Sequence, residues 1–409
     1  MKRPAEETAE GPAKQAAVEK HYDVVAGLPS YMEEASISFV TSVVDQGCQK
    51  YFPGKRCLLL NADCKSTDQT KARFLETSTV CDKEYHSTAT TAEGKGAGLR
   101  LVFERMVEVN AAMGFCVDTD LTTITAEWVR SFAEALLNGC DMATPRYKRH
   151  RCDGTITNLV TYPVVSACFG VSVRQPIGGD FAFSLNAVKA FLEPEWTPTI
   201  KKYGIDIFMT TTVIGKDLKL VEAELPAKVH SPSLPKLVGM VEQVVGTLLA
   251  QIKMSGVAVK AKLAQPEVLT PELVKWGGGG DMSVPEMDTD PQVLASKAKE
   301  CLAANEGLLV AETPKEIVAD VKAAVDASSL SADVWAKLLF WGIAEYCARP
   351  EESRPPIIKV LQLFYLLRAV SHLSAVQNMT NEAAEDIVTA QMELIKLQRP
   401  ALAARLNSV

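Results

Sequence analysis

The sequence has few of the features that mark membrane, secreted or nucleic-acid-binding proteins. No segment reaches the roughly 18 uninterrupted apolar residues of a membrane-spanning helix, and the N-terminus lacks an apolar core of signal-peptide length. The ten cysteines include no Cys-x-x-Cys pair, and the five histidines include none at zinc-finger spacing. A net charge of −7 argues against a nucleic-acid surface. We therefore expect a cytoplasmic protein with reduced thiols that binds neither membrane nor nucleic acid.

The chain divides into three parts by composition. Residues 1–20 are rich in Ala, Glu, Lys and Pro, which predicts a disordered tail. Strand and helix patterns alternate over residues 21–235, and helical patterns alone fill residues 236–409, interrupted by a Gly/Pro/Asp-rich linker at 276–291. We expect an α/β domain followed by an all-α C-terminal domain, which packs on the first or mediates homo-oligomer formation.

The alternating part predicts a doubly wound, mostly parallel sheet. A first apolar run at 24–26 precedes Pro29 and a helix through Ile37 and Val44, and a second run at 56–60 ends in Asn61-Ala62-Asp63. A third strand is expected at 80–88. Ligands of such sheets bind beyond the carboxyl ends of the strands, so the candidate site lies at that edge.

The central motif is Asp118-Thr119-Asp120, which directly follows the short apolar run at 113–117. In an extended chain residues two apart face the same side, so the two carboxylates share one small volume. A hard divalent cation is the natural occupant of such a pair. The same tripeptide recurs at Asp288-Thr289-Asp290 in a loop without a preceding strand, so its position after a buried strand gives the first copy its weight.

Two further segments indicate anion binding. Lys95 lies in a glycine-rich loop before a helix and matches neither common phosphate-loop pattern; we favour its lysine or backbone amides beside a diphosphate over a merely flexible helix entry. The second segment, 146–158, runs from four Arg or Lys side chains and His150 into Asp-Gly and Thr-Ile-Thr-Asn. Arginine followed by hydroxyls at a helix start suits a small carboxylate or phosphate.

Later acidic and imidazole side chains complete the constellation. Asp180 follows Gly178-Gly179, a pairing that allows close backbone approach to a ligand, although a simple turn explains it too. Asp206 opens a helix, where a capping role suffices. His230 ends the α/β segment, where a third metal ligand would arrive. Together these residues suit a nucleoside diphosphate sugar held by Mn²⁺ or Mg²⁺, which stabilises the charge on the leaving diphosphate.

The order of these motifs resembles the GT-A glycosyltransferases, and more narrowly the retaining mannosylglycerate and glucosylglycerate synthases with their relative glucosyl-3-phosphoglycerate synthase. The resemblance covers residues 22 to about 235. It is carried by six segments in family order: 27–34, 118–120, 149–158, 174–180, 203–206 and 228–230. It implies a Rossmann-like GT-A nucleotide-sugar domain and transfer of a hexose to D-glycerate, giving a compatible-solute type product.

The resemblance also implies a role for each candidate residue. Nucleoside binding falls to Pro29, Tyr31, Glu33 and Asp63, and diphosphate binding to Lys95. Metal binding falls to Asp120 and His230, with Asp118 beside them on the ribose or a metal-bound water. Sugar binding falls to Asp180 with Gly178 and Gly179, and glycerate binding to Arg149, Ile156 and Thr157. Asp206 is expected to position the substrate rather than to form a covalent intermediate, because retention in this family is thought to need no protein nucleophile.

The sequence departs from the family at two positions. Asp180 stands where Glu is usual, which shortens the reach to the sugar by one methylene. Thr155 stands near the position of an Arg in the phosphoglycerate enzymes, which favours free glycerate, although Arg146, Lys148 and Arg151 keep 3-phosphoglycerate open.

Donor choice between GDP-mannose and a glucose nucleotide stays open as well. Two other functions compete. A sugar-phosphate nucleotidyltransferase would need a basic Gly-rich loop after the first strand, which residues 26–31 do not form. An inactive paralogue acting as a helical scaffold is the second.

Overall fold

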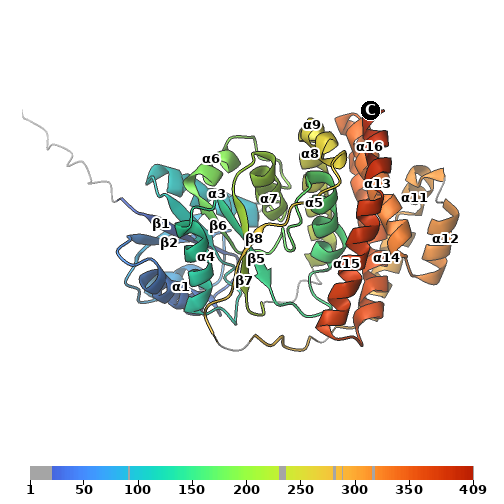
Figure 1. The fold of residues 1–409 in the computed structure, drawn as a ribbon. Helices are drawn as coiled ribbons and strands as arrows, with labels where there is room; N and C mark the ends of the chain where they lie inside the picture. The colour runs from blue at the N-terminus through green and yellow to red at the C-terminus, as the bar shows by residue number, and fades with distance from the viewer. Residues whose placement is uncertain are drawn as a thin grey trace, which may run out of the picture.

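The computed structural model describes residues 21–90, 93–229, 236–279, 282–287, 289–315 and 318–408. The expected tail at 1–20 lies outside these ranges. An eight-stranded sheet forms the centre of the first half, with strand order β3-β2-β1-β4-β6-β5-β7-β8 (Figure 1). Its strands are β1 Val24–Ser30, β2 Cys57–Asp63, β3 Asp82–Ser87, β4 Met113–Cys116, β5 Met142–Tyr147, β6 Phe181–Ser184, β7 Leu220–Leu225 and β8 Glu272–Val274.

The sheet is parallel except at β6, which runs antiparallel to both β4 and β5. Seven helices accompany it within residues 37–215: α1 Ile37–Tyr51, α2 Thr70–Glu76, α3 Lys95–Glu108, α4 Ala126–Leu137, α5 Tyr162–Phe169, α6 Leu185–Leu192 and α7 Ile205–Gly215. A π-helical turn, η1 Thr157–Thr161, leads into α5. The predicted α/β class with a mostly parallel sheet is confirmed.

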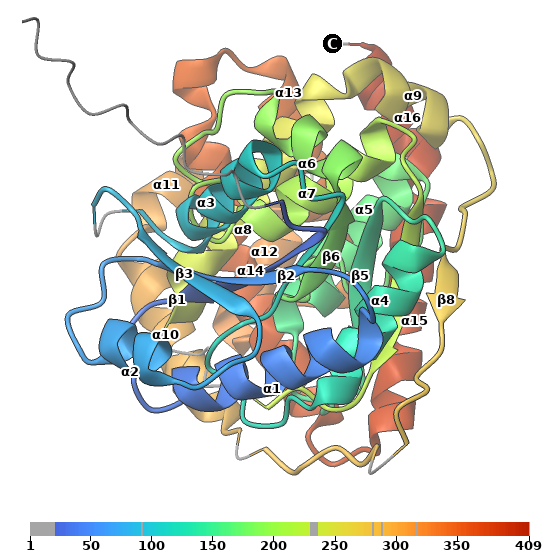
Figure 2. The same cartoon turned by 90° about the vertical axis from the view of Figure 1, so that its left-hand side faces the viewer.

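Alternating side chains of the buried strands build two cores. In β1, Val24, Ala26 and Leu28 face α1 and α4, whereas Val25 faces the opposite side with α3, α6 and α7 (Figure 2). Gly27 allows α3 to lie close to the sheet, since a Cβ there would come within 2.7 Å of Val102 Cγ2. The sheet is therefore covered on both faces, which leaves its carboxyl edge for ligands.

The C-terminal half is helical and shares a core with the first half. Its helices are α8 Leu237–Met254, α9 Gly256–Leu263, α10 Pro291–Ala303, α11 Glu306–Glu312, α12 Val318–Ala327, α13 Ala332–Ala348, α14 Pro355–Val376, α15 Asn381–Leu397 and α16 Arg399–Asn407. One apolar cluster joins Leu159 and Phe169 to residues of α8, α13 and α14. By length and composition alone, the helical segments Leu237–Met254 and Glu351–Val376 are able to cross a membrane, but both are largely buried in this core.

Three strands were not predicted from the sequence. Strand β5 carries Pro145 in a basic segment, β6 follows the turn at Gly178-Gly179 and has four residues, and β8 comes from the region expected to be all-helical, where it pairs with β7. The proline is tolerated because β6 pairs with β5 only at Met142 and Ala143, so beyond Ala143 only β7 lies alongside.

Candidate active site

The candidate site lies where the chain leaves the carboxyl end of β4. Val117 extends the strand by donating its backbone N–H to Gly27 O at 3.2 Å, and Asp118 follows at the edge. Three other segments reach the same place: the first residue of α3, the turn before β6, and the chain after β7. They bring Lys95, Asp180 and Lys228 to Asp118.

Two lysines whose side chains are 15% and 4% exposed flank the Asp118 carboxylate. Lys95 Nζ lies 2.7 Å from Oδ1, and Lys228 Nζ lies 2.8 Å from Oδ2. Burial alone would raise the pKa of Asp118, but Lys228 and Lys95 together hold it well below its usual value. The carboxylate is therefore ionised, and two positive charges stand at the ligand edge of the sheet.

Asp180 is fully buried and uses both of its oxygens inside the protein. Its Oδ1 accepts the backbone N–H of Asp118 at 2.7 Å and lies 3.4 Å from Lys228 Nζ, while Oδ2 accepts the hydroxyl of Tyr147. Burial raises the pKa of Asp180. In this arrangement Asp180 fixes Asp118 and Tyr147, so a sugar hydroxyl would have to take the place of one of these donors.

The two glycines before Asp180 are required by space. A Cβ at Gly178 would come within 2.1 Å of Pro145 Cγ, and one at Gly179 within 2.5 Å of Asp118 Oδ2. Gly179 also has φ +97, a conformation that L side chains rarely adopt. Their carbonyls accept from the lysines, Gly178 O from Lys228 Nζ at 3.0 Å and Gly179 O from Lys95 Nζ at 2.8 Å. Gly178-Gly179 was predicted to let a ligand approach the backbone closely. In the structure, Lys95, Lys228 and Asp118 make this close approach.

Asp206 stands in the first turn of α7 and joins the same cluster. Its Oδ1 lies 3.8 Å from Lys95 Nζ and accepts no hydrogen bond from the described residues. Burial raises the pKa of this carboxyl, and Lys95 opposes the increase. Asp206 therefore acts on Lys95 through charge, which suits a positioning group.

The glycine-rich entry to α3 has a packing explanation. The backbone N–H groups of Gly94 and Ala97 donate to Lys201 O, and that of Gly96 donates to Lys202 O. A Cβ at Gly96 would come within 1.9 Å of Ile200 O. These amides already have partners, so the lysine side chain remains as the group of this loop able to meet a diphosphate.

The expected nucleoside residues form a second group beside the cluster. Pro29 lies inside β1, with its carbonyl accepting from Thr119 Oγ1 at 2.7 Å, and Tyr31 is 56% exposed just beyond the strand. Asp63 is fully buried, accepting from Tyr85 OH at 2.9 Å and from Ser30 and Ser66. Asp63 thus holds the ends of β1, β2 and β3 together.

Glu33 and Asp120 create a negative region next to Asp118. Burial raises the pKa of Glu33 to about 7, and the charges of Asp120 and Asp118 add to the increase. The carboxylate of Asp120 is partly buried and makes no hydrogen bond or ion pair with the described residues. Oxygen donors that repel one another suit a hard divalent cation. No three potential ligand side chains cluster in metal-binding geometry in the described ranges, and the expected ligand His230 lies outside them.

The basic segment 146–153 is largely neutralised by acidic partners. Arg146 pairs with Glu222, Lys148 with Glu224, Arg149 with Asp153, and His150 and Arg151 both with Glu286 of the linker. As a result, no basic side chain of this segment is left without an acidic partner.

The three expected acceptor residues lie in two different environments. Arg149 Nε donates to Gln175 Oε1 at 3.0 Å, and its guanidinium lies 5.4 Å from the centre of the Tyr147 ring. Ile156 and Thr157 are buried at the start of η1. Arg149 is therefore connected to the carboxylate cluster through Tyr147, whereas Ile156 and Thr157 belong to the junction with the helical half.

Sequence reasoning missed two members of the cluster. Lys228 was noticed only as a neighbour of His230, and Tyr147 only as part of the basic segment. A signal for Lys228 was its position just after a strand, on the edge that carries ligands.

The second copy of the Asp-Thr-Asp tripeptide has a local role. Its Asp290 caps α10 by accepting the backbone N–H of Gln292 at 2.8 Å, and its Asp288 lies outside the described residues.

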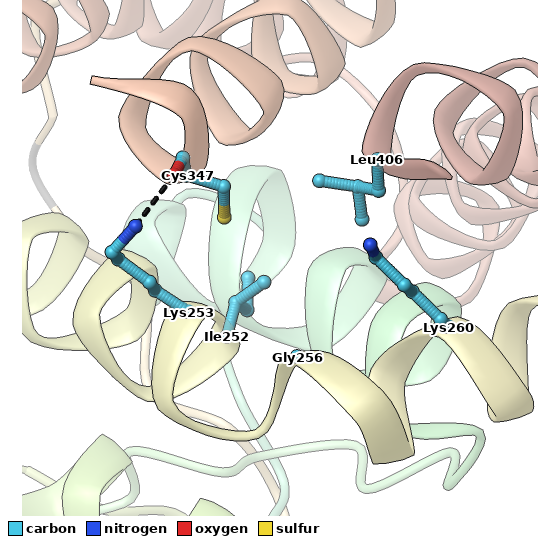
Figure 3. Close-up of a pocket in the computed structure, with 6 residues that line it drawn as sticks. All are labelled: Ile252, Lys253, Gly256, Lys260, Cys347 and Leu406. Atoms are coloured by element: carbon cyan, nitrogen blue, oxygen red, sulfur yellow. Dashed lines mark hydrogen bonds between the residues drawn. The ribbon is translucent and has the colours of Figure 1, made fainter. Parts of the chain in front are cut away.

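A separate cavity of about 230 Å³ lies in the helical half and shares no residue with this cluster. Figure 3 shows Lys253, Lys260, Cys347 and Leu406 around it, with Lys253 Nζ donating to Cys347 O at 2.5 Å. Its lining has no carboxylate, so it lacks the groups that the transfer chemistry needs.

One protein-family model matches part of the chain. Residues 76–247 match the family model "Mannosylglycerate synthase, GT domain". No curated protein matches the chain.

Among solved structures, glucosyl-3-phosphoglycerate synthase from Mycobacterium tuberculosis is similar in two complexes. The complex with Mn²⁺, UDP and glucosyl-3-phosphoglycerate has 22% identity and a TM-score of 0.46, covering 56% of this chain and 80% of the other. The complex with Mg²⁺ and UDP has 21% identity and a TM-score of 0.45, covering 56% and 79%. The part of the chain that matches the family model includes Lys95, Asp118, Asp180, Asp206 and Lys228, so the segment that carries the carboxylate and lysine cluster is similar to the glycosyltransferase domain of mannosylglycerate synthase.

Proposed function

We propose that the protein transfers a hexose from a nucleoside diphosphate sugar to D-glycerate with retention of configuration. The observation that carries the proposal is the pair of lysines on either side of Asp118, inside the segment that the family model matches. A diphosphate is the part of the donor that needs two fixed positive charges. The product is then mannosylglycerate or glucosylglycerate.

The lysines explain how the leaving diphosphate is stabilised. Lys95 and Lys228 are held in place by Asp118 and by the carbonyls of Gly179 and Gly178. Charges that are fixed before the reaction stabilise developing negative charge without reorganisation. The ammonium groups therefore bind phosphate oxygens as the glycosidic bond breaks, while Asp118 keeps both lysines aligned.

A divalent cation, Mn²⁺ or Mg²⁺, is expected beside them. Asp120 and His230 would hold it, with the Glu33 and Asp118 charges nearby favouring a cation. When bound, such an ion acts as a Lewis acid on the diphosphate. Pro29 and Tyr31 then bind the nucleoside, because they lie at the end of β1 next to this region. Asp63 is fully buried and holds that end in place through Ser30.

The acceptor side favours free glycerate. Arg146, Lys148 and Arg151 already have acidic partners, and Thr155 Oγ1 lies 2.7 Å from Tyr365 OH. No unpaired cation of this segment remains for an additional phosphate. Arg149 lies next to Tyr147 and also pairs with Asp153, so it would meet the glycerate carboxylate in exchange for that partner. Ile156 and Thr157 would hold the adjoining η1 turn in place.

Retention proceeds in this proposal without a protein nucleophile. Asp206 is buried and directed at Lys95, and Asp180 is occupied by Tyr147 and Asp118. The leaving phosphate then takes the proton of the acceptor hydroxyl as that oxygen forms the new bond to the sugar. Mass spectrometry of the protein after turnover tests this step, since a glycosyl adduct on Asp206 would contradict it.

Nucleotide release is the test of the proposed reaction. GDP-mannose and UDP-, GDP- and ADP-glucose are offered with Mn²⁺ or Mg²⁺, and D-glycerate and 3-phosphoglycerate are added separately. We expect release that needs D-glycerate and is lost in Asp120→Ala. Nucleotide release that needs 3-phosphoglycerate instead would show that 3-phosphoglycerate, not D-glycerate, is the acceptor. No acceptor-dependent release from a folded, nucleotide-binding protein would favour a scaffold function.

A further inference from the structure

Three cysteines that are distant in the sequence meet at the amino end of the sheet. Cys48 comes from α1, Cys57 is the first residue of β2, and Cys81 immediately precedes β3. All three line one surface cavity of about 290 Å³, together with Lys55 and Arg56. The strands begin at this edge, so the cluster lies at the opposite edge of the sheet from Asp118.

Strand register and one buried carboxylate bring the sulfur atoms together. Leu58 of β2 pairs with Asp82 of β3, so Cys57 and Cys81 are next to each other one step before that pair. Neighbouring strands lie about 4.8 Å apart, within the Cα separation that a disulfide needs. Asp45 of α1 accepts the backbone N–H of Cys81 at 2.8 Å, which fastens the turn before β3 to the helix that carries Cys48.

The three thiols differ in charge. Hydrogen bonds to Cys48 and Cys81 lower the pKa of Cys57 to about 4, while a hydrogen bond to Cys57 and burial raise the pKa of Cys81 against the opposing effect of Cys48. By contrast, burial raises the pKa of Cys168 to about 12. The thiolate is the reactive form of cysteine, so Cys57 is the nucleophile of the group.

We propose that this cluster is an oxidation site, in which a hydroperoxide converts Cys57 and Cys81 into a disulfide. The Cys57 thiolate attacks one oxygen of hydrogen peroxide; an S–O bond forms, the O–O bond breaks, and the hydroxide that leaves takes a solvent proton to become water. Cys81 then attacks the sulfenic sulfur, an S–S bond forms, and the S–O bond breaks to release a second water that carries the Cys81 proton. Two thiols are oxidised, and one peroxide is reduced.

Other features of the cluster agree with oxidation rather than with metal binding. Across the described ranges no three Cys, His, Asp or Glu side chains are arranged to hold a metal ion. Cys48, Cys57 and Cys81 all lie within those ranges, so they do not form such a group. The cavity opens to the surface beside Lys55 and Arg56, which gives a small oxidant access. Cys48 is buried in α1, and we expect it to stay reduced.

The test uses the full native chain and hydrogen peroxide, followed by alkylation of free thiols, trypsin digestion and mass spectrometry. Trypsin separates the three cysteines, because Cys48 falls in 21–50, Cys57 in 57–65 and Cys81 in 74–83. We expect peptides 57–65 and 74–83 to become linked with the loss of two hydrogens, at a rate at least about tenfold above oxidation of Cys301. Fragmentation places the link at Cys57 rather than Cys64.

Cysteine variants separate the two oxidation steps. Cys81→Ser should stop at a sulfenic acid on Cys57 that a dimedone probe captures, whereas Cys301→Ser and Cys64→Ser should leave the link unchanged. A link that involves Cys48, or oxidation of Cys57 no faster than that of Cys301, would overturn the proposal. The disulfide is measured directly, so the result does not depend on the transfer reaction.

Discussion

The environment of Asp118 shows how single residues set the chemistry of the site. Its carboxylate is kept ionised by two lysines that come from segments 133 residues apart, Lys95 and Lys228. Each lysine is also bound to a glycine carbonyl, so neither is free to move when substrate arrives. The residues around Asp118 therefore act as one unit in which each member has several partners.

Replacing Lys228 tests the role of this unit in transfer. Lys228→Gln keeps most of the length but removes the charge, so we expect kcat to fall by about 10²–10³, as for loss of one fixed donor at a reacting oxyanion. Lys219→Gln, at a half-exposed lysine that begins the approach to β7, is the matched control. Steady-state kinetics measure kcat for both variants. A kcat of Lys228→Gln within threefold of the wild type would show that Lys228 takes no part in the mechanism.

Gly179 offers a steric test of the same unit. Gly179→Ala places a methyl group 2.5 Å from Asp118 Oδ2 and strains a backbone at φ +97, so we expect activity to fall about 100-fold. Gly139→Ala has the same strain, at φ +76, but nothing within 4 Å. That control should lose roughly 1 kcal/mol of unfolding free energy and keep its activity; equal activity in both variants would contradict the packing argument.

Glu33 makes the stability of the fold depend on pH. Its pKa rises from 4.5 unfolded to about 7 folded, mainly through burial, so the folded state holds its proton more tightly. The unfolding free energy should therefore decrease as pH rises from 4.5 to 7. Urea midpoints at pH 5 and pH 8 measure this decrease, and Glu33→Gln should show a smaller one than the wild type or Glu34→Gln. An identical decrease in all three would show that Glu33 titrates normally.

At the residue scale, the sequence predicted the acids better than their partners. Asp118, Asp180 and Asp206 were each found beside a strand end, a Gly-Gly turn or a helix start, which are local signals. Lys228 and Tyr147 were missed because their partners lie 110 and 33 residues away, and long-range ion pairs leave no local pattern. The roles given to individual residues still rest on the resemblance.

At the scale of elements, three C-terminal helices hold the segment 155–159. Trp335 Nε1 of α13 donates to Leu159 O at 2.8 Å, Tyr365 OH of α14 lies 2.7 Å from Thr155 Oγ1, and Gln391 Nε2 of α15 donates to Asn158 O at 3.1 Å. The helical half thus positions the turn that carries Ile156 and Thr157.

Tyr365→Phe tests whether this support matters for the acceptor. Loss of one neutral hydrogen bond, about 1 kcal/mol, should raise the KM for the acceptor about fivefold and leave the KM for the donor unchanged. Tyr346→Phe, at a tyrosine of α13 whose ring lies 5.3 Å from the Arg354 guanidinium, is the control. Equal changes in both KM values would indicate general destabilisation instead.

Prediction of elements failed where the usual patterns were interrupted. The helical character of the region that contains α8, α13, α14 and α15 was predicted, because their apolar spacing continues over several turns. Strand β5 was missed because Pro145 and basic side chains hide a strand that pairs on one side only beyond Ala143. Strand β8 has three residues, too few for alternation to show.

At the scale of the whole molecule, the two halves share one apolar core. Leu159, Phe169 and Ile207 from the first half lie in the same cluster as Trp335 and Phe364 of the helical half. Separating the halves would expose this surface to water, so neither half is expected to unfold alone. The boundary predicted at residue 235 is therefore a change of architecture within one packed body.

Thermal unfolding measures this coupling. We expect one calorimetric transition, with far-UV circular dichroism and tryptophan fluorescence changing at the same temperature. Trp128 of the first half and Trp335 of the second, both fully buried, report on the two halves in single-tryptophan variants. Two separate transitions would mean that the shared core does not unite the halves.

The fate of a labelled sugar distinguishes retaining transfer from the alternatives. A donor that supports acceptor-dependent nucleotide release is supplied with ¹³C at the anomeric carbon, and NMR follows the label with D-glycerate present. The account predicts an α-linked product, the configuration of the donor, in the wild type and its loss in Lys228→Gln. A β-linked product, or label found only in free hexose, would contradict a retaining transfer at the lysine-flanked Asp118.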